Sequence, residues 1–459
     1  MADSLLGQAA HLVDDVIVAV STPQGRGAIG VVRLSGELAG LERIVHQLTR
    51  RTPSESQDRR LTLVTVHDVA NRPLDRALLA WFRAPHSYTG EHVVELQMHG
   101  NPVLLRLALD ACVAGGARLA GPGEFTRRAL AHGKLSMLQA EGVDALIRAP
   151  SAAAARVAQR HLGGELGQRL HGWTGRLLGA AVALEALVDF PDEVEEDEVA
   201  HHLDGLADLS REMGALVDTA RAGRRLLDGV RVAITGPVNA GKSTLLNALL
   251  GHDRAIVSPI AGTTRDVVSE TVEWAGVAFR LEDTAGLRET SDPVEAIGIE
   301  RSSRARSEAD VVVLVQDGRR PADSLHQDAA LSAPSTAPTV AVATHADLLT
   351  DAQRRALGEE WTLVDGPGGT GLEAVRDAIV TASEVSTGPA ELVLHTARQE
   401  DAMVAAHGAV GEALGAGPEE PVLAAVALRR AGRALEELTG QWVDERVLDE
   451  LFARFCIGK

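Results

Sequence analysis

One segment constrains the fold of this chain most strongly: Gly236-Pro237-Val238-Asn239-Ala240-Gly241-Lys242-Ser243, which matches the pattern G-x-x-x-x-G-K-[ST]. Residues 230–234 before it predict a buried strand, and residues 244–250 after it predict a helix. In this arrangement glycines let backbone N–H groups surround phosphate oxygens, and the helix N-terminus adds partial positive charge. Lys242 would reach the β- and γ-phosphates, and Ser243 would hold Mg²⁺. The alternative is a glycine-rich turn with a chance Lys-Ser, which the flanking elements disfavour.

Two more motifs lie where a P-loop nucleotide-binding domain needs them. Asp283-Thr284-Ala285-Gly286 follows the strand-like residues 277–281. An Asp here helps to hold Mg²⁺, and the Gly N–H senses the γ-phosphate. Between this motif and the P-loop, residues 261–266 (Ala-Gly-Thr-Thr-Arg-Asp) should form a switch loop whose Thr264 completes the Mg²⁺ shell. The three motifs together predict a nucleoside triphosphatase.

The residues that choose the base are less typical. Strand-like residues 340–343 end in Thr344-His345-Ala346-Asp347, where a GTPase normally carries Asn-Lys-x-Asp. The Asp347 carboxylate can accept from guanine N1–H and the exocyclic amine, a donor pair that adenine lacks. Residues 365–369 only partly match the usual Ser-Ala-x-x-Gly. We therefore expect guanine selectivity with weaker affinity.

Two catalytic groups of Ras-like GTPases are missing. The residue after Asp283-Thr284-Ala285-Gly286 is Leu287, where Ras-like enzymes have a Gln that orients the attacking water. No arginine finger is visible in the sequence either. Another group must therefore orient the water and neutralise the charge that develops during hydrolysis.

The residue composition and the spacing of apolar residues change along the chain. Its 459 residues are enough for about three domains. Short β-rich runs with glycine turns come first, then Ala/Leu/Arg-rich helical stretches, then alternating strands and helices, then helix again. We predict a multidomain α+β and α/β protein with an N-terminal α+β domain at 1–122. A helical domain follows in two parts, at 123–225 and 385–459. Between these parts, a P-loop domain with a parallel sheet at 226–384 is inserted into the helical domain.

The net charge and the cysteine content limit the kinds of protein and the cell compartment that fit this sequence. The net charge of −19 argues against broad, nonspecific nucleic-acid binding, although a local basic patch stays possible. The acidic run at 192–198 is most simply a solvated face. Cys112 and Cys456 are the only cysteines, so a reducing compartment fits. The N-terminus is unlike a signal peptide and no run suits a bilayer, so a cytoplasmic protein without a membrane partner is expected.

Several segments have no place in an ordinary GTPase. They are Thr22-Pro23-Gln24-Gly25-Arg26-Gly27, Tyr88-Thr89-Gly90-Glu91, residues 122–129 (Pro-Gly-Glu-Phe-Thr-Arg-Arg-Ala), Gly133-Lys134-Leu135, Asp189-Phe190-Pro191-Asp192-Glu193 and Phe455-Cys456-Ile457-Gly458-Lys459. With the nucleotide motifs, they make the chain resemble, along its whole length, the bacterial tRNA-modification GTPase family MnmE, also called TrmE. The terminal Cys-x-Gly-Lys is the most specific of these signatures.

The resemblance implies an N-terminal domain similar to the folate-binding domains of aminomethyltransferases. In that family it binds a tetrahydrofolate derivative, of the 5-formyl or methylene type, at a homodimer interface. By carry-over the folate-binding residues are Arg33, Glu95, Lys134 and Lys459. A glutamate can accept from the pterin N–H groups, and Arg and Lys can meet carboxylate or carbonyl oxygens. The alternatives are a strand-face charge for Glu95 and a solvated helix residue for Lys134.

The resemblance also supplies the missing catalytic groups. In the family the G domains dimerise, and K⁺ takes the place of an arginine finger. The implied K⁺ ligands are Asn239, Ser258, Ile260 (by its carbonyl) and Thr263, and Glu295 would orient the water; the alternative for Glu295 is a surface helix residue. The full predicted nucleotide site comprises Asn239, Ala240, Gly241, Lys242, Ser243, Thr244, Ser258, Thr263, Thr264, Asp283, Thr284, Ala285, Gly286, Thr344 and Asp347.

The two cysteines differ in their expected roles. The Cys456 thiolate could attack a uracil ring or a folate-derived carbon, and a small apolar residue at a helix end is an equally weighted alternative. Cys112 is most simply a core residue.

The resemblance implies a K⁺-stimulated GTPase that acts with a flavoprotein partner, MnmG (also called GidA), in a hetero-oligomer. Together they would install an aminomethyl or carboxymethylaminomethyl group at C5 of the wobble uridine of certain tRNAs, with a folate-derived carbon. FAD would come only through the partner, because no G-x-G-x-x-G lies in a strand–helix context. Two alternatives stay open: a regulatory GTPase that binds ribosomes or RNA, and a folate aminomethyltransferase with a regulatory G domain.

Overall fold

The computed structural model describes residues 15–51, 58–190, 196–237, 239–252, 269–283, 307–320, 337–365, 369–385, 392–440 and 445–458. The chain divides into two compact units. The first comprises Met1–Asp144, Leu162–Thr174 and Gly432–Lys459, and the second comprises Ala145–His161 and Gly175–Ala431. Since these two units are coarser than the predicted four-segment division, the domain boundaries stay a prediction.

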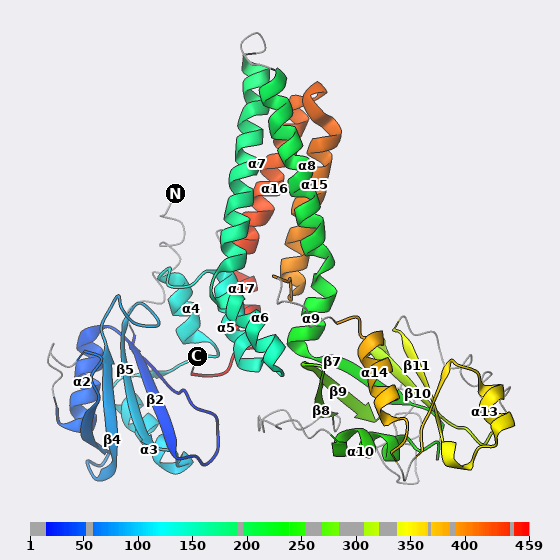
Figure 1. Cartoon of the computed structure of the whole chain (residues 1–459). Helices are drawn as coiled ribbons and strands as arrows, with labels where there is room; N and C mark the ends of the chain where they lie inside the picture. Colours follow the sequence, from blue (N-terminus) through cyan, green and yellow to red (C-terminus); the bar gives the residue numbers. More distant parts are fainter. Residues whose placement is uncertain are drawn as a thin grey trace, which may run out of the picture. The chain divides into compact units, whose positions relative to one another are not determined.

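A six-stranded sheet forms the centre of the first unit (Figure 1). Its order is β3-β4-β5-β2-β1-β6, and all neighbours are antiparallel except β1 and β6. The strands are β1 Ile17–Val20, β2 Ile29–Gly36, β3 Thr62–His67, β4 Pro73–Phe82, β5 His92–His99 and β6 Arg118–Leu119. Helices α2 (Leu38–Thr49) and α3 (Pro102–Ala114) pack on this sheet.

The alternation of side chains along β2 and β5 positions a polar pair. Val32 and Leu34 of β2 and Val94 and Leu96 of β5 are fully buried in the core. Because successive side chains of a strand point to opposite faces, Arg33 and Glu95 project from the other face. The register pairs Arg33 with Glu95 directly, so the sheet itself brings these two predicted residues together.

The remainder of the first unit is helical. Helix α4 (Glu124–Ala131) and helix α17 (Glu445–Phe452) belong to it, and the chain ends in the segment after α17. Helices α5 (Met137–Arg148), α6 (Ala152–Leu162), α7 (Glu165–Asp189) and α16 (Pro421–Thr439) run from one unit into the other.

The second unit contains a sheet of order β12-β11-β10-β7-β9-β8. Its strands are β7 Val230–Thr235, β8 Ser269–Trp274, β9 Val277–Asp283, β10 Val311–Asp317, β11 Thr339–Thr344 and β12 Trp361–Leu363. All neighbours are parallel, as the sequence predicts, except at the edge, where β8 pairs with β9 in the antiparallel direction. The helices beside it are α10 (Lys242–His252), α13 (Asp351–Leu357) and α14 (Leu372–Ala382).

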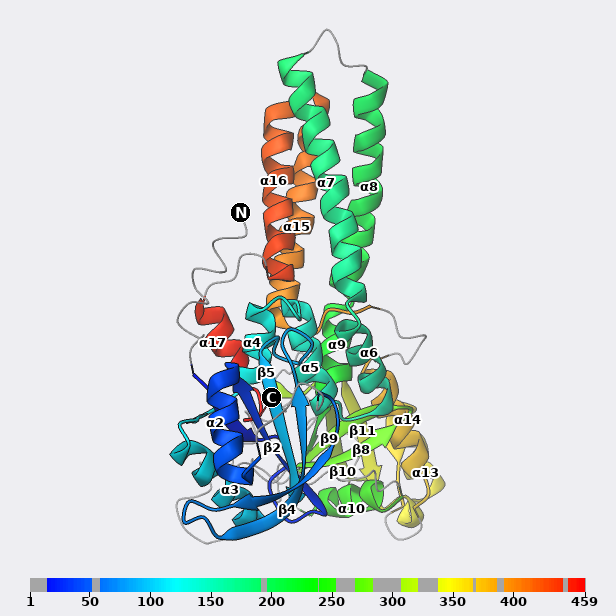
Figure 2. The same ribbon diagram turned by 90° about the vertical axis from the view of Figure 1, so that its left-hand side faces the viewer.

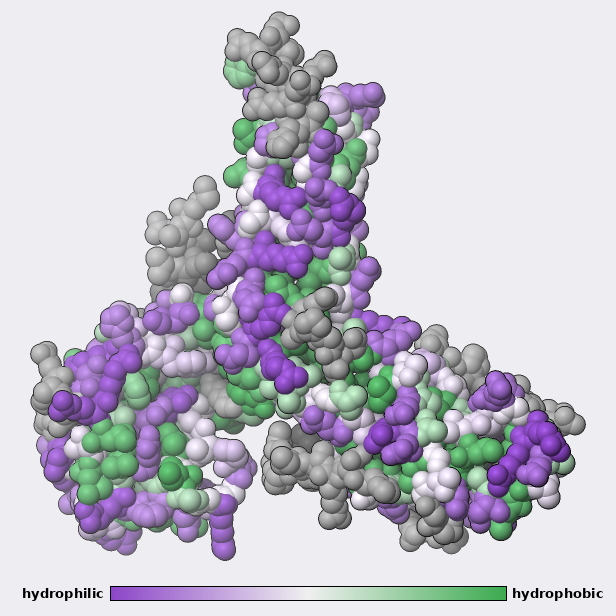
Figure 3. Space-filling view, in the orientation of Figure 1, coloured by the Kyte–Doolittle hydropathy of each residue, from purple (hydrophilic) through white to green (hydrophobic). Residues whose placement is uncertain are grey.

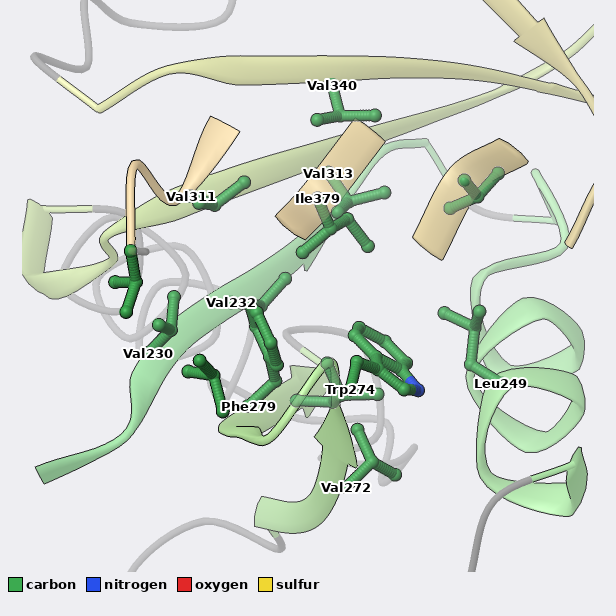
Figure 4. Close-up of a cluster of buried hydrophobic side chains, with 14 of the residues drawn as sticks. Val230, Val232, Leu249, Val272, Trp274, Phe279, Val311, Val313, Val340 and Ile379 are labelled. Atoms are coloured by element: carbon green, nitrogen blue, oxygen red, sulfur yellow. The ribbon is translucent and has the colours of Figure 1, made fainter. Parts of the chain in front are cut away.

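The core of this sheet explains why its strands are nearly continuous apolar runs. Parallel strands are covered on both faces, so both sets of alternating side chains must be apolar. Val232, Val313 and Phe279 are fully buried between the sheet and its helices (Figure 4). This packing holds the carboxyl end of β7, where the P-loop begins.

Four long helices, which lie wholly or mostly in the second unit or begin in it, run side by side in both ribbon views: α7, α8 (Glu196–Asp218), α15 (Ala397–Ala416) and α16 (Figures 1 and 2). Helix α9 (Ala220–Asp228) leads from them into β7. The face in Figure 3 shows hydrophilic and hydrophobic residues mixed over these helices, and Leu178 and Val182 of α7 are more than half exposed. Within the described residues, no helix has the length and apolar character needed to cross a membrane.

Candidate functional site

The backbone of the P-loop in the second unit explains both glycines of its motif. It joins β7 to α10, as the motif predicts. A Cβ on Gly236 would lie 2.0 Å from the carbonyl oxygen of Val315, and its φ is +145°. Gly241 has φ +91°, and Asn239 adopts the left-handed region at φ +64°. These conformations favour Gly and tolerate Asn, so both glycines of the motif are explained by backbone geometry.

Lys242 is held inside this loop. Its side chain is buried, and its Nζ donates to the carbonyl oxygens of Gly236 at 2.9 Å and Pro237 at 2.7 Å. These contacts keep the ammonium group over the loop, where it can meet phosphate oxygens. Ser243 and Thr244 are exposed in the first turn of α10. The structure therefore brings the predicted phosphate-binding residues 239–244 together at one helix N-terminus.

Thr344, the departure from the usual Asn, still ties β11 to the P-loop. Its hydroxyl oxygen is buried and lies 2.9 Å from the carbonyl oxygen of Ala240 and 3.1 Å from that of Gln316. A hydroxyl has one hydrogen, so it donates to one of these carbonyls at a time. Threonine at this position thus still connects the end of β11 to the P-loop.

Charged side chains surround the segment that is predicted to read the base, residues 344–347. Nδ1 of His345 lies 3.4 Å from Oδ1 of Asp317. The pKa of Asp317 is lowered, chiefly by a hydrogen bond from the Arg319 side chain. Asp347 lies exposed in the short 3-10 helix η2 (Ala346–Leu348), and its charge contributes to the raised pKa of Arg319, after the larger effect of Asp317. Asp347 is therefore a solvent-facing carboxylate shortly after the end of β11.

Several predicted residues lie outside the described part of the chain. They are Ser258, Ile260, Thr263, Thr264, Thr284, Ala285, Gly286, Glu295 and Lys459. The backbone of Asp283 ends β9 in register with Ile234 of β7, the strand that leads into the P-loop. Oxygen donors such as Ser243, Thr264 and Asp283 suit the preference of Mg²⁺ for hard ligands. No group of three or more His, Cys, Asp or Glu within the described residues forms another metal cluster.

The first unit holds the other predicted constellation. Nε of Arg33 donates to Oε1 of Glu95 at 2.9 Å, and its Nη2 lies 2.8 Å from the same oxygen. The guanidinium also lies over two rings, 5.9 Å from the centroid of Tyr88 and 5.8 Å from that of Phe125. Cation–π contact and a charged hydrogen bond together fix the orientation of this ion pair.

Lys134 contacts the same loop as Arg33. Its Nζ donates to the carbonyl oxygen of Pro85 at 3.0 Å, and its side chain lies beside Gly90, where a Cβ would be 3.3 Å from its Cγ. Tyr88, which Arg33 contacts, lies between these two loop residues in sequence. The structure thus brings Arg33, Glu95 and Lys134 around one loop, although Lys134 itself is exposed.

The C-terminal segment reaches this site. The carbonyl oxygen of Gly458 accepts from the Ser21 hydroxyl at 2.9 Å and from Nη1 of Arg33 at 3.4 Å. Cys456 is exposed, whereas Cys112 is buried in the core, where desolvation raises its thiol pKa to about 12. Sequence reasoning missed Ser21, because its partner is more than four hundred residues away and no local pattern marks it.

Behind the site lies a buried charge cluster around Arg128. This side chain is 1% exposed, and its guanidinium pairs with Glu91 at 3.1 Å, Glu124 at 3.2 Å and Asp15 at 2.7 Å. Burial alone would raise the pKa of Glu124, but hydrogen bonds from Arg118 and the Gly121 N–H, with the charges of Arg118 and Arg128, bring it below its usual value. The cluster joins the loop before β5 to helix α4, so it supports the elements that carry Tyr88 and Phe125.

The chain is similar to known proteins over nearly its whole length. Residues 16–134 match the family model described as GTP-binding protein TrmE N-terminus, and residues 137–456 match that of the MnmE helical domain. A tRNA modification GTPase MnmE of Azoarcus sp. is 42% identical over 97% of this chain and 98% of its own. One of Thermus thermophilus is 43% identical over 97% of this chain and 99% of its own. Among solved structures, the G domain of the T. maritima FeoB iron transporter covers 34% of this chain and 99% of its own, at 25% identity and a TM-score of 0.26.

Proposed function

Because the chain belongs to the MnmE family of tRNA modification GTPases, it is a GTP hydrolase of tRNA modification, and we propose that its target is C5 of the wobble uridine. In this proposal a folate derivative supplies the one-carbon unit for an aminomethyl or carboxymethylaminomethyl group. A flavoprotein of the MnmG (GidA) type supplies FAD in a hetero-oligomer, and the chain itself acts as a homodimer. The direct test is the wobble nucleoside of tRNA from cells with and without this chain.

One observation supports this proposal above the alternatives. The same chain holds a P-loop at the start of α10 and, in its other unit, an Arg33–Glu95 ion pair against a C-terminal segment with an exposed thiol. A regulatory GTPase that only binds RNA would need no such second constellation. An aminomethyltransferase with a regulatory G domain would need it, but would leave tRNA nucleosides unchanged.

The residues of each site have distinct roles in the proposal. Mg²⁺ would be held by Ser243 and Thr264, and K⁺ by Asn239, Ser258, Ile260 and Thr263. K⁺ supplies positive charge where other GTPases use an arginine finger. Glu295 would orient the attacking water, a function that Leu287 cannot perform.

For the folate, Glu95 is the proposed acceptor of the pterin N–H groups. Its Oε1 already accepts from Arg33, and no donor to its Oε2 is found within the described residues. Arg33 therefore orients the carboxylate and leaves one oxygen for the ligand. Lys134 and Lys459 would meet ligand carboxylate or carbonyl oxygens.

GTP hydrolysis is expected to be faster in K⁺ than in Na⁺ by at least about tenfold, because the chain lacks a visible arginine finger and carries Asn239 in its P-loop. The measurement is steady-state phosphate release at equal ionic strength in KCl and NaCl. Equal rates in both salts would contradict the K⁺ proposal.

Asp347→Asn is expected to weaken GTP binding roughly 10- to 100-fold, because the carboxylate hydrogen bonds to guanine are lost. Binding of xanthosine triphosphate should rise, since the new amide donates where xanthine has a carbonyl. Fluorescence titration with both nucleotides measures this. Asp377→Asn, a change at an exposed position of α14, is the matched control and should alter neither affinity. Unchanged GTP binding in Asp347→Asn would show that another segment selects the base.

A further inference from the structure

The segment after α17 is attached to the first unit through its backbone. Ile457 forms an antiparallel bridge with Pro122, and the Gly123 N–H donates to the carbonyl oxygen of Cys456 at 3.4 Å. One residue further, the Gly458 carbonyl accepts from the Ser21 hydroxyl. Backbone contacts therefore hold the chain at Cys456 itself and two residues beyond it.

Gly458 is the only residue type that fits its position. Its φ is +99°, and an added Cβ would lie 2.3 Å from the Val20 carbonyl oxygen and 3.0 Å from Cα of Ser21. Both neighbours are backbone atoms of β1 and the residue after it, which cannot move aside independently of the sheet. The close approach allows the Ser21 hydroxyl to reach the Gly458 carbonyl.

An aromatic anchor holds the other side of the segment. Phe452 and Phe455 are almost fully buried, with ring centroids 5.1 Å apart. Both pack on Gly123, where a Cβ would lie 2.8 Å from atoms of each. Cys456 comes directly after this anchor and is exposed, so an accessible thiol lies on a backbone that is held on both sides.

We propose that Ser21 is a positioning residue for Cys456. Its hydroxyl and the close approach of Gly458 fix the C-terminal segment, and the Arg33 side chain, through the same carbonyl, links that segment to the Arg33–Glu95 pair. Without the hydroxyl, the segment keeps its contacts with Pro122 and Gly123 but loses its hydrogen bond to Ser21, so the thiol is held less firmly. The consequence of this fixation for tRNA modification rests on the proposed function, but the fixation itself does not.

Hydrogen–deuterium exchange of the full-length protein, read on the peptide that covers residues 455–459, tests the proposal. Ser21→Ala removes one hydrogen bond, so exchange in this peptide is expected to accelerate about fivefold. Ser21→Thr keeps a hydroxyl and should restore slow exchange. Gly458→Ala should accelerate exchange more than Ser21→Ala, because its Cβ has no room. Gly358→Ala, at φ +74° with nothing within 4 Å of an added Cβ, is the matched control and should leave this peptide unchanged.

Hydrogen exchange in β2 and β5 distinguishes a local effect on the C-terminal segment from a general loss of structure in the first unit. These strands should exchange equally in Ser21→Ala and in the unaltered chain. Slow exchange of the C-terminal peptide in Ser21→Ala, or acceleration in the strands as large as in that peptide, would overturn the proposal. If exchange responds as expected but tRNA from cells with the unaltered chain lacks the modified wobble uridine, the positioning stands and the proposed function fails.

Discussion

Arg128→Met is expected to lower the free energy of unfolding of the first unit by about 3–5 kcal/mol. The arginine is 1% exposed and pairs with Glu91, Glu124 and Asp15, of which the first two are themselves only 10% exposed at their side chains. Methionine has a similar volume but leaves buried carboxylates without their main cation. Breaking a buried ion cluster from one side is costly because the remaining charges stay desolvated.

Hydrogen exchange of β2 and β5 in the full chain measures this change as a free energy of opening. Arg72→Met is the matched control: its guanidinium pairs with Asp68, its side chain is 76% exposed, and the expected loss is below about 1 kcal/mol. Equal losses in the two variants would contradict a structural role of the buried cluster.

The same cluster predicts the direction of a pH effect. The pKa values of Asp15 and Glu124 are lowered in the folded chain: burial opposes ionisation, but hydrogen bonds and charges of Arg118 and Arg128 outweigh it. A lowered folded pKa contributes stability that is fully present above the usual value of 4.5 for Glu124 and is lost as the pH falls through the folded value. Exchange in β2 should therefore accelerate as the pH falls below about 4.5, after correction for the intrinsic exchange rate, and should do so less steeply in Arg128→Met.

Cys456→Ser is expected to abolish tRNA modification while GTP hydrolysis stays unchanged. The thiol is exposed, whereas the other cysteine, Cys112, is buried, so Cys456 carries the accessible thiol of this chain. Serine keeps the size of the side chain but is a poor nucleophile at neutral pH. Phosphate release and wobble-nucleoside analysis, performed on the same variant, measure the two activities.

Cys112→Ser is a useful comparison because it changes a buried thiol that cannot react with the tRNA or the folate. It should leave modification intact in whatever folded protein forms, since Cys112 lies in the core of the first unit. Normal wobble modification in cells that carry only Cys456→Ser would exclude an obligatory thiolate.

The P-loop domain was the most predictable part of the chain. Its strands are local apolar runs, and the predicted elements at β7, α10, β9 and β11 are all present. The antiparallel edge strand β8 was not predicted, because its first three residues, Ser269–Thr271, are all polar and no local signal gives the direction of pairing. The resemblance to the MnmE family, drawn from motifs spread along the chain, is confirmed by the comparisons over 97% of its length.

The first unit was harder to predict, and the reason is sequence distance. Arg33 and Glu95 could be named only through the family resemblance; their direct pairing is a property of strand register. Strands β3 and β4 were not predicted at all. The contacts of Arg128 with Asp15 and of Ser21 with Gly458 join residues more than a hundred positions apart, and no periodicity within a segment reports such contacts.

The central claim is that this chain modifies the wobble uridine of tRNA, and it is tested most directly by mass spectrometry of tRNA nucleosides. Three strains are compared: one with the chain, one with the chain deleted, and one complemented with Lys242→Ala, which removes the ammonium group from the P-loop. The account predicts C5-aminomethyl-type wobble uridine in the first strain and its absence from the other two. The same amount of this nucleoside in all three strains would contradict it.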